Sequence, residues 1–117
     1  MDKHNAIRAV NEHLGHEQLT PHNTSWSTMH AEQGSWWLNI RSQKFEEDLH
    51  LCLEIPRGFI WLHIPPNGLH ADDFQAKSQT DARRNIEIRC NEDEPDYMTD
   101  RRSGSQFAQY TQHDFVI

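Results

Sequence analysis

Hydrophobic and polar residues alternate through the middle of the chain. Within residues 47–55, every second position from Leu49 onward is aliphatic: Leu49, Leu51, Leu53 and Ile55. Residues 36–41 and 60–64 show the same alternation, through Trp36, Leu38 and Ile40 and through Ile60, Leu62 and Ile64. Because successive side chains of a strand point to opposite faces, the pattern predicts three strands, each with one apolar face.

The segment Pro56-Arg57-Gly58 predicts a hairpin turn between the second and third of these strands. A four-residue loop, Pro56 through Phe59, pairs Leu53 with Leu62 and Leu51 with Ile64. Burial favours this register because it makes one face purely aliphatic. The opposite face then carries His50, Cys52, Glu54, Trp61 and His63, with Cys52 and His63 as direct cross-strand neighbours.

An amphipathic helix is predicted over residues 3–14. Its apolar residues recur at helical spacing: Ile7, Val10 and Leu14. Asp2 is suited to cap the amino end, and Gly15 is suited to end the helix. The apolar stripe is narrow, so we expect the helix to pack on a sheet.

The remaining residues predict one further strand and several loops. Ile86 and Ile88 alternate with charged residues and indicate a strand that ends near Cys90. Residues 15–35 and 91–106 are rich in polar and turn-forming residues, so we expect loops that meet a partner. Apolar residues from Phe107 onward predict that the C-terminus docks on the body. The expected fold class is α+β, an N-terminal helix packed on a mostly antiparallel sheet of about four or five strands.

The composition indicates one small globular domain over residues 1–117. The mass is 13.8 kDa, hydrophobic residues make up 35%, and the mean hydropathy is -0.91. A chain of this size supports one modest core. The formal net charge of -7 argues against a basic nucleic-acid binder. No apolar stretch approaches the roughly 20 residues that a membrane-spanning helix needs, so we expect no membrane partner.

The cysteines and the first residues of the chain indicate in which cellular compartment we expect the protein. Cys52 and Cys90 could form one disulfide at most. The first residues contain no apolar segment of the kind found in secretory signals. We therefore expect a cytoplasmic protein with two free thiols.

The chain contains nine histidines, so we consider whether any of them have the spacing of metal ligands. The paired spacing of a helical zinc site, with two histidines four residues apart around a glutamate, does not occur. The alternative set is Cys52, His50 and His63, which share one strand face and are of the types that zinc prefers. Because no supporting spacing accompanies them, we expect no structural metal and no other cofactor.

One segment has the pattern of a nuclease strand. Ile86-Glu87-Ile88-Arg89 resembles the hydrophobic-acid-hydrophobic-basic strand of the PD-(D/E)xK nuclease fold. The resemblance implies a divalent metal held by Glu87 and an upstream aspartate such as Asp73. Asp72 and Asp81 are the other upstream carboxylates. Arg89 replaces the usual lysine, and because a guanidinium stays protonated it cannot act as a base. A nuclease with Asp73, Glu87 and Arg89 is therefore an alternative, and the leaning is towards no enzyme.

The sequence favours a small acidic binding module that recognises a macromolecular partner. A protein partner is favoured, because its recognition needs no special chemistry, and the acidic runs 46–48 and 92–96 would attract a basic one. A nucleic acid is the alternative partner, through stacking on an exposed tryptophan. The candidate binding residues are Trp61, expected to be the exposed tryptophan, His50 and His63 beside it, and the anion-binding pair Arg101 and Arg102.

Overall fold

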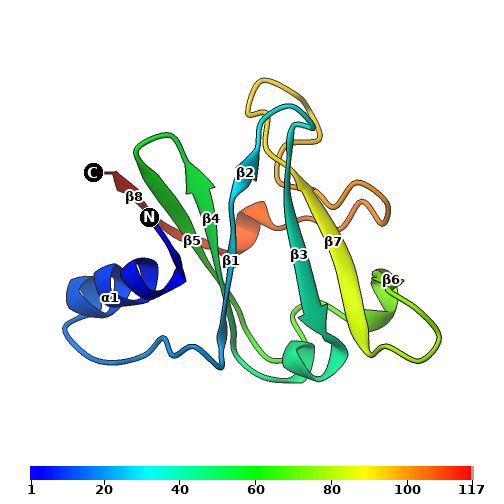
Figure 1. Cartoon of the computed structure of the whole chain (residues 1–117), viewed down its shortest axis with the longest axis horizontal. Coiled ribbons are helices and arrows are strands. Elements are labelled where there is room, and N and C mark those ends of the chain that lie inside the picture. Colours follow the sequence, from blue (N-terminus) through cyan, green and yellow to red (C-terminus); the bar gives the residue numbers. More distant parts are fainter. Residues whose placement is uncertain (117) are drawn as a thin grey trace.

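The computed structural model describes residues 1–116, which form one α-helix and two four-stranded sheets (Figure 1). Helix α1 spans Lys3–Leu14. The first sheet has the order β1-β4-β5-β8, with strands Thr24–Ser27, Leu49–Ile55, Gly58–Ile64 and Thr111–Val116. The second has the order β2-β3-β7-β6, with strands Met29–His30, Ser35–Arg41, Arg83–Arg89 and Gln75–Ala76.

All strand pairs are antiparallel except β1 with β4. The α+β class, with an N-terminal helix and mostly antiparallel strands, is therefore confirmed. Short 3-10 turns at Ser42–Glu46, Ala71–Asp73 and Ala108–Tyr110 connect the strands. Within residues 1–116, no helix is long and apolar enough to cross a bilayer.

Helix α1 begins and ends where its local signals predict. The carboxylate of Asp2 accepts a hydrogen bond from the backbone N–H of Asn5 at 2.9 Å, which satisfies one of the free donors of the first turn. Gly15 follows the helix with φ of 78° and donates to the carbonyl of Asn11. The side chain of Asn11 then holds the next segment, accepting from the backbone N–H of Leu19 at 2.9 Å.

Strands β1 and β2 lie within residues 15–35, so the prediction of a loop there is wrong for these residues. The chain runs along β4 of the first sheet and, after Thr28, continues along β3 of the second. Ser27 ties the crossing to the second sheet, because its hydroxyl accepts from the backbone N–H of Trp37 at 2.9 Å. A strand this polar and short carries no apolar alternation, so its pairing is decided by neighbours distant in the sequence.

The predicted faces of the β4–β5 hairpin are confirmed, but the predicted register is wrong by two residues. Leu51 lies opposite Leu62, Cys52 opposite Trp61, and His50 opposite His63. The loop is Pro56 and Arg57 alone, with Arg57 at φ of 68°. A shift of two residues preserves which side chains share a face, so the aliphatic face forms in either register. Cys52 and His63 thus share a face without being direct neighbours.

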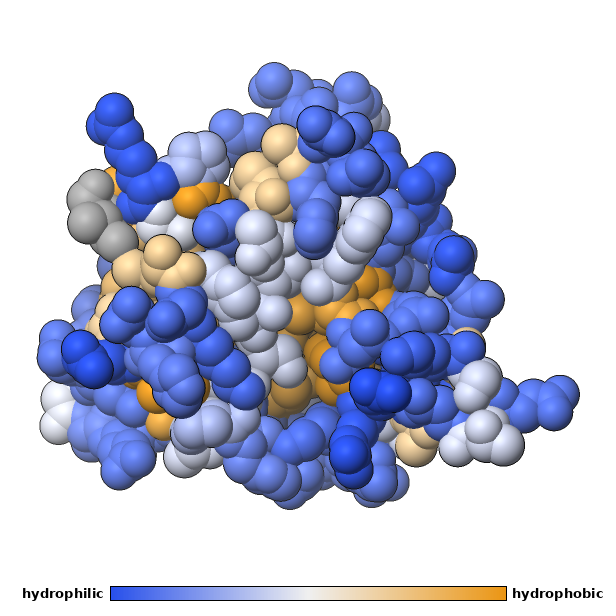
Figure 2. All heavy atoms as spheres, viewed as in Figure 1, coloured by the Kyte–Doolittle hydropathy of each residue, from blue (hydrophilic) through white to orange (hydrophobic). Residues whose placement is uncertain are grey.

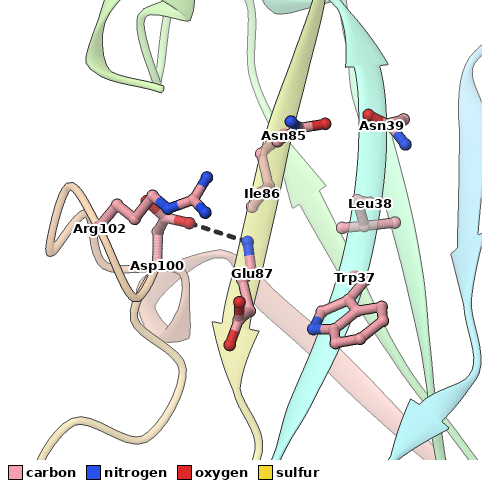
Figure 3. A pocket seen from close by; sticks show the side chains of 8 residues that line it. All are labelled: Trp37, Leu38, Asn39, Asn85, Ile86, Glu87, Asp100 and Arg102. Carbon is pink, nitrogen blue, oxygen red and sulfur yellow. Dashed lines mark hydrogen bonds between the residues drawn. The ribbon is translucent and has the colours of Figure 1, made fainter. Parts of the chain in front are cut away.

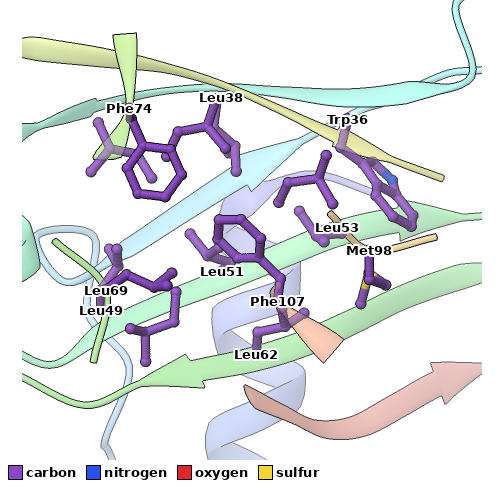
Figure 4. Close-up of a cluster of buried hydrophobic side chains, with 14 of the residues drawn as sticks. Trp36, Leu38, Leu49, Leu51, Leu53, Leu62, Leu69, Phe74, Met98 and Phe107 are labelled. Carbon is purple, nitrogen blue, oxygen red and sulfur yellow. The ribbon is translucent and has the colours of Figure 1, made fainter. Parts of the chain in front are cut away.

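The main core lies between the two sheets (Figure 4). The aliphatic face of the β4–β5 hairpin packs against Trp36, Leu38 and Ile40 of β3 and against Ile86 and Ile88 of β7. Phe74, Met98 and Phe107 reach this core from outside the strands and are almost fully buried. The expected docking of the C-terminal segment is confirmed: Phe107 enters the core and β8 pairs with β5.

A second, smaller core lies between α1 and the other face of the first sheet. Ala6 and Val10 of the helix pack with Leu19 over Cys52, Phe59 and Trp61. The expectation that Trp61 is the exposed tryptophan is wrong, because helix α1 covers its face and leaves only 5% of it exposed. Trp37, on the second sheet, is the tryptophan with the exposed side chain, at 45%.

Gly58 is the residue that allows β8 to approach β5. A Cβ atom at this position would overlap the carbonyl oxygen of Phe115 and lie 3.2 Å from the Cα of Val116. We expect Gly58→Ala to lower the free energy of unfolding by about 1–3 kcal/mol or more, because backbone atoms must move to relieve the overlap. Urea unfolding measures this loss, and hydrogen exchange should show faster exchange in β8.

Gly34→Ala is the matched control for this substitution. No atom lies within 4 Å of a Cβ at Gly34, but its φ is +66°. Gly34→Ala should therefore lower the free energy of unfolding by about 1–2 kcal/mol, through backbone strain alone, and should leave hydrogen exchange in β8 unchanged. Equal exchange in β8 for Gly58→Ala and wild type would contradict the predicted clash.

Candidate binding surface

The outer face of the second sheet presents three cross-strand pairs from β3 and β7. In register these are Trp37 with Glu87, Asn39 with Asn85, and Arg41 with Arg83. Their neighbours along each strand point into the core, because side chains alternate between the two faces. These six residues, together with Arg101 and Arg102 from the following loop, are called the Trp37 face.

Trp37 carries the largest exposed aromatic surface on this face. Its side chain is 45% exposed, whereas Trp36, one position earlier, is fully buried. The imidazole ring of His30, on β2, stacks against the indole with ring centroids 4.3 Å apart and an interplanar angle of 23°. This stack supports the indole from one side, so Trp37 is held in place although it is exposed.

Glu87 fastens the following loop to the sheet. One carboxylate oxygen accepts from the hydroxyl of Ser35 at 2.9 Å and from the guanidinium of Arg101 at 3.2 Å. The backbone N–H of Glu87 donates to the Asp100 carboxylate at 2.9 Å, and its carbonyl accepts from the N–H of Arg101 at 2.7 Å. The side chain of Asp100 is buried and also accepts from the N–H and hydroxyl of Ser103. The loop that carries Arg102 is therefore anchored.

A shallow pocket of about 220 Å³ lies on this face (Figure 3). Trp37 stands at one side over β3, and Arg102 stands at the other side of β7. Asn85 on β7 and Asn39 on β3 lie at the upper end of the pocket in this view. Leu38, Ile86, Glu87 and Asp100 complete its lining. The pocket thus combines an aromatic ring, two amides and a guanidinium.

The arginines around the second sheet differ in how they are paired. Arg83 forms a two-pronged ion pair with Asp81, with a closest distance of 2.7 Å, and Arg89 lies 3.4 Å from the carboxylate of Asp96. Within residues 1–116, Arg41 and Arg102 are exposed and form no ion pair. Free guanidinium groups are therefore present at the Arg41 end of the Trp37 face and, from Arg102, beside β7.

The structure places the remaining predicted binding residues on the first sheet, under α1. His50 is 1% exposed and stacks on His63, with ring centroids 4.5 Å apart. Trp61 donates from its indole N–H to Nδ1 of His50 at 3.1 Å, and His63 lies 2.9 Å from Asp48. Burial and the neighbouring His63 lower the pKa of His50 to about 4, although Asp48 acts in the opposite direction. His50 and Trp61 are therefore structural in this arrangement, and only His63 is partly accessible.

The alternative metal ligands are not assembled as a site. The predicted free thiols are confirmed, and burial raises the pKa of the Cys52 thiol to about 12, so it stays protonated at neutral pH. Nδ1 of His50 is already used by Trp61. In the described part of the chain, no group of three or more histidine, cysteine, aspartate or glutamate side chains is placed to hold a metal ion.

The alternative nuclease residues point to different partners. Glu87 is bound by Ser35 and Arg101, whereas Arg89 pairs with Asp96. Asp73 is exposed on its 3-10 turn, and the neighbouring Asp72 lies 3.8 Å from Arg84. No hydrogen bond or ion pair within residues 1–116 links Asp73 to Glu87. A nuclease role for these residues stays a prediction.

Sequence reasoning missed Trp37, Asn39 and Asn85 as candidate binding residues. Trp37 and Asn39 alternate with the apolar residues of β3, which is the signal of an outward face, whereas Asn85 precedes the strand predicted from Ile86 onward. What the pattern does not show is which outward face another element covers. Helix α1 covers the polar face of β4 and β5, whereas the Trp37 face keeps its pocket open.

The surface of the molecule seen from the side of Figure 1 is predominantly hydrophilic. Figure 2 shows residues coloured as hydrophobic near the middle of the visible face, with hydrophilic residues on most of the surrounding surface. Together, the fold and the exposed Trp37 define an α+β domain with an exposed aromatic sheet face. No family model, no curated protein and no solved structure matches the chain.

Proposed function

We propose that this chain is a binding module, without catalysis of its own, that recognises a macromolecular partner through the Trp37 face. The observation that carries the proposal is the exposed indole of Trp37, held by His30 beside an open pocket. Exposing a tryptophan to water has a hydrophobic cost that burial against a partner removes. Tryptophan and arginine are also the residue types that most often dominate the energetics of interfaces.

The arrangement of the surrounding groups supports recognition over simple exposure. Asn39 and Asn85 offer amide donors and acceptors, and within residues 1–116 neither side chain forms a hydrogen bond. The loop after β7 is anchored through Glu87 and Asp100, so Arg102 is presented from an ordered backbone. Binding to such a preorganised surface costs little conformational entropy.

Comparative capture tests this proposal. Immobilised wild type, Trp37→Ala and Arg8→Ala would be incubated with extract of the source cells, in parallel samples with and without nuclease treatment. Arg8 is exposed on α1, away from the Trp37 face, and serves as the matched control. We expect a species that wild type and Arg8→Ala retain and that Trp37→Ala retains about tenfold less. Identical retained species for all three proteins would overturn the proposed binding surface.

A further inference from the structure

We propose that the Trp37 face binds a single-stranded nucleic acid, with a base stacked on Trp37 and phosphates held by Arg102 and Arg41. This inference rests on the proposed function and names the partner for the same surface. The sequence favoured a protein partner because its recognition needs no special chemistry, and the net charge of -7 argued against a basic nucleic-acid binder. The arrangement of side chains around the pocket favours a nucleic acid instead.

The stacking platform is Trp37. One side of its indole is covered by His30, and 45% of the side chain is exposed. Every nucleobase presents a flat π surface, and base–aromatic stacking contributes about 1–3 kcal/mol per base. Trp36 and Trp61 are buried, and Trp26 is partly buried and packs edge-on against Phe59. Trp37 is therefore the tryptophan that is placed to stack on a ligand.

Groups that can bind the edge of a base lie next to this platform. Asn39 and Asn85 form the neighbouring cross-strand pair, two residues along β3 from Trp37. An asparagine amide has both donors and an acceptor, which matches the mixed donors and acceptors of a base edge. Both amides line the same pocket as the indole.

Arginines surround the Trp37 face, where they could bind the phosphates of a nucleic-acid strand. Five of the eleven lysines and arginines of the chain surround the outer face of this sheet: Arg41, Arg83, Arg89, Arg101 and Arg102. The nearby carboxylates of Asp81, Glu87 and Asp96 each face one of these arginines, which offsets their charge. The carboxylate of Asp100 is buried and accepts three hydrogen bonds. Arg41 and Arg102 remain free for phosphate.

The spacing of these groups suits a strand of nucleotides. From Trp37 to Arg41 the row along β3 extends about 13 Å at the usual rise of a strand, enough for a short run of nucleotides. The pocket of about 220 Å³ is shallow and open, smaller than the enclosed sites of free small ligands. An acidic peptide would satisfy the arginines, but its carboxylate side chains offer no flat ring to stack on the indole of Trp37. In a duplex, the bases stack on one another and cannot lie on Trp37.

Fluorescence anisotropy with labelled single strands tests the inference. The probes are RNA and DNA of mixed sequence and about 12 nucleotides, compared at several salt concentrations. Wild type and Arg8→Ala should bind equally, and Trp37→Ala should bind at least about fivefold more weakly. Arg41→Ala and Arg102→Ala should each weaken binding and reduce the salt slope by about one. Trp37→Phe, which keeps an aromatic ring, should fall between wild type and Trp37→Ala.

Three outcomes would overturn the inference. The first is the absence of saturable binding of either strand, and the second is equal affinity of wild type and Trp37→Ala. The third is equal or tighter binding of a labelled duplex of the same sequence, or of adenosine monophosphate added as a competitor. A different result would separate the two proposals: the single-stranded probes do not bind, and after nuclease treatment wild type still retains a protein that Trp37→Ala does not. In that case the Trp37 face binds a protein, and the proposed function stands. If both experiments show no effect of Trp37→Ala, both proposals are wrong.

Discussion

Phe107→Ala should lower the free energy of unfolding by about 3–5 kcal/mol. Phe107 is fully buried, and its ring lies 6.0 Å from that of Phe74 in the core between the sheets. Figure 4 shows its side chain between the hydrophobic side chains of the two sheets. Truncation of Phe107 would remove apolar contacts and leave a cavity between the two sheets. The cavity would persist in part, because the surrounding structure relaxes only partially. Because small domains are stable by only about 5–15 kcal/mol, this loss is a large part of the total.

Urea unfolding followed by circular dichroism measures the effect of this substitution. Phe107→Leu should cost less than Phe107→Ala, because it keeps most of the apolar volume. Val116→Ala is the control for an apolar truncation at the surface, since Val116 is 71% exposed, and it should change stability by less than about 0.5 kcal/mol. A loss below about 1 kcal/mol for Phe107→Ala would show that Phe107 does not fill the core in solution.

Lowering the pH from 6.5 to 4 should destabilise the fold through His50 by about 3 kcal/mol. Burial, with His63 stacked on the ring, lowers the pKa of His50 from 6.5 to about 4 in the folded chain. Within this window the unfolded chain binds a proton that the folded chain does not. Stability therefore falls as pH falls, by about 1.4 kcal/mol per pH unit from this group, and the loss is complete below the folded pKa.

The structural reason for this loss is the position of His50 in its network. Protonation would put a proton on Nδ1, which accepts the indole N–H of Trp61, and would place a charge beside His63. Both groups lie on the sheet face that α1 covers, so their separation would expose the second core. Acid should therefore weaken the packing of α1 before that of the main core.

Urea unfolding at several pH values between 7 and 4 measures this dependence. His50→Gln keeps an acceptor for Trp61 and removes the titrating ring, so its stability should depend less steeply on pH. His4→Gln replaces an exposed histidine and is the matched control, with the same slope as wild type. An unchanged slope in His50→Gln would assign the acid sensitivity to other groups.

The local features of the fold could be predicted from the sequence because each depends on neighbouring residues. Helix α1 follows from its apolar spacing, from Asp2 as the cap and from Gly15 as the end. The two faces of the β4–β5 hairpin follow from strict alternation. The register of the hairpin does not follow from alternation. It depends on the turn, which Pro56 and Arg57 alone close, and Arg57 adopts the left-handed region that a non-glycine residue rarely adopts. Only the pairing along the whole hairpin stabilises that conformation.

The candidate surface shows the same division. Alternation by itself determined that Trp61 and Trp37 lie on the polar-alternating faces of their strands, away from the aliphatic core. Tertiary structure alone decided which of these faces meets water: α1 packs on the face of Trp61, and the face of Trp37 stays open. The periodicity of a strand records which side is apolar, a property of adjacent residues. Covering the other side depends on an element more than forty residues away, which no local pattern encodes.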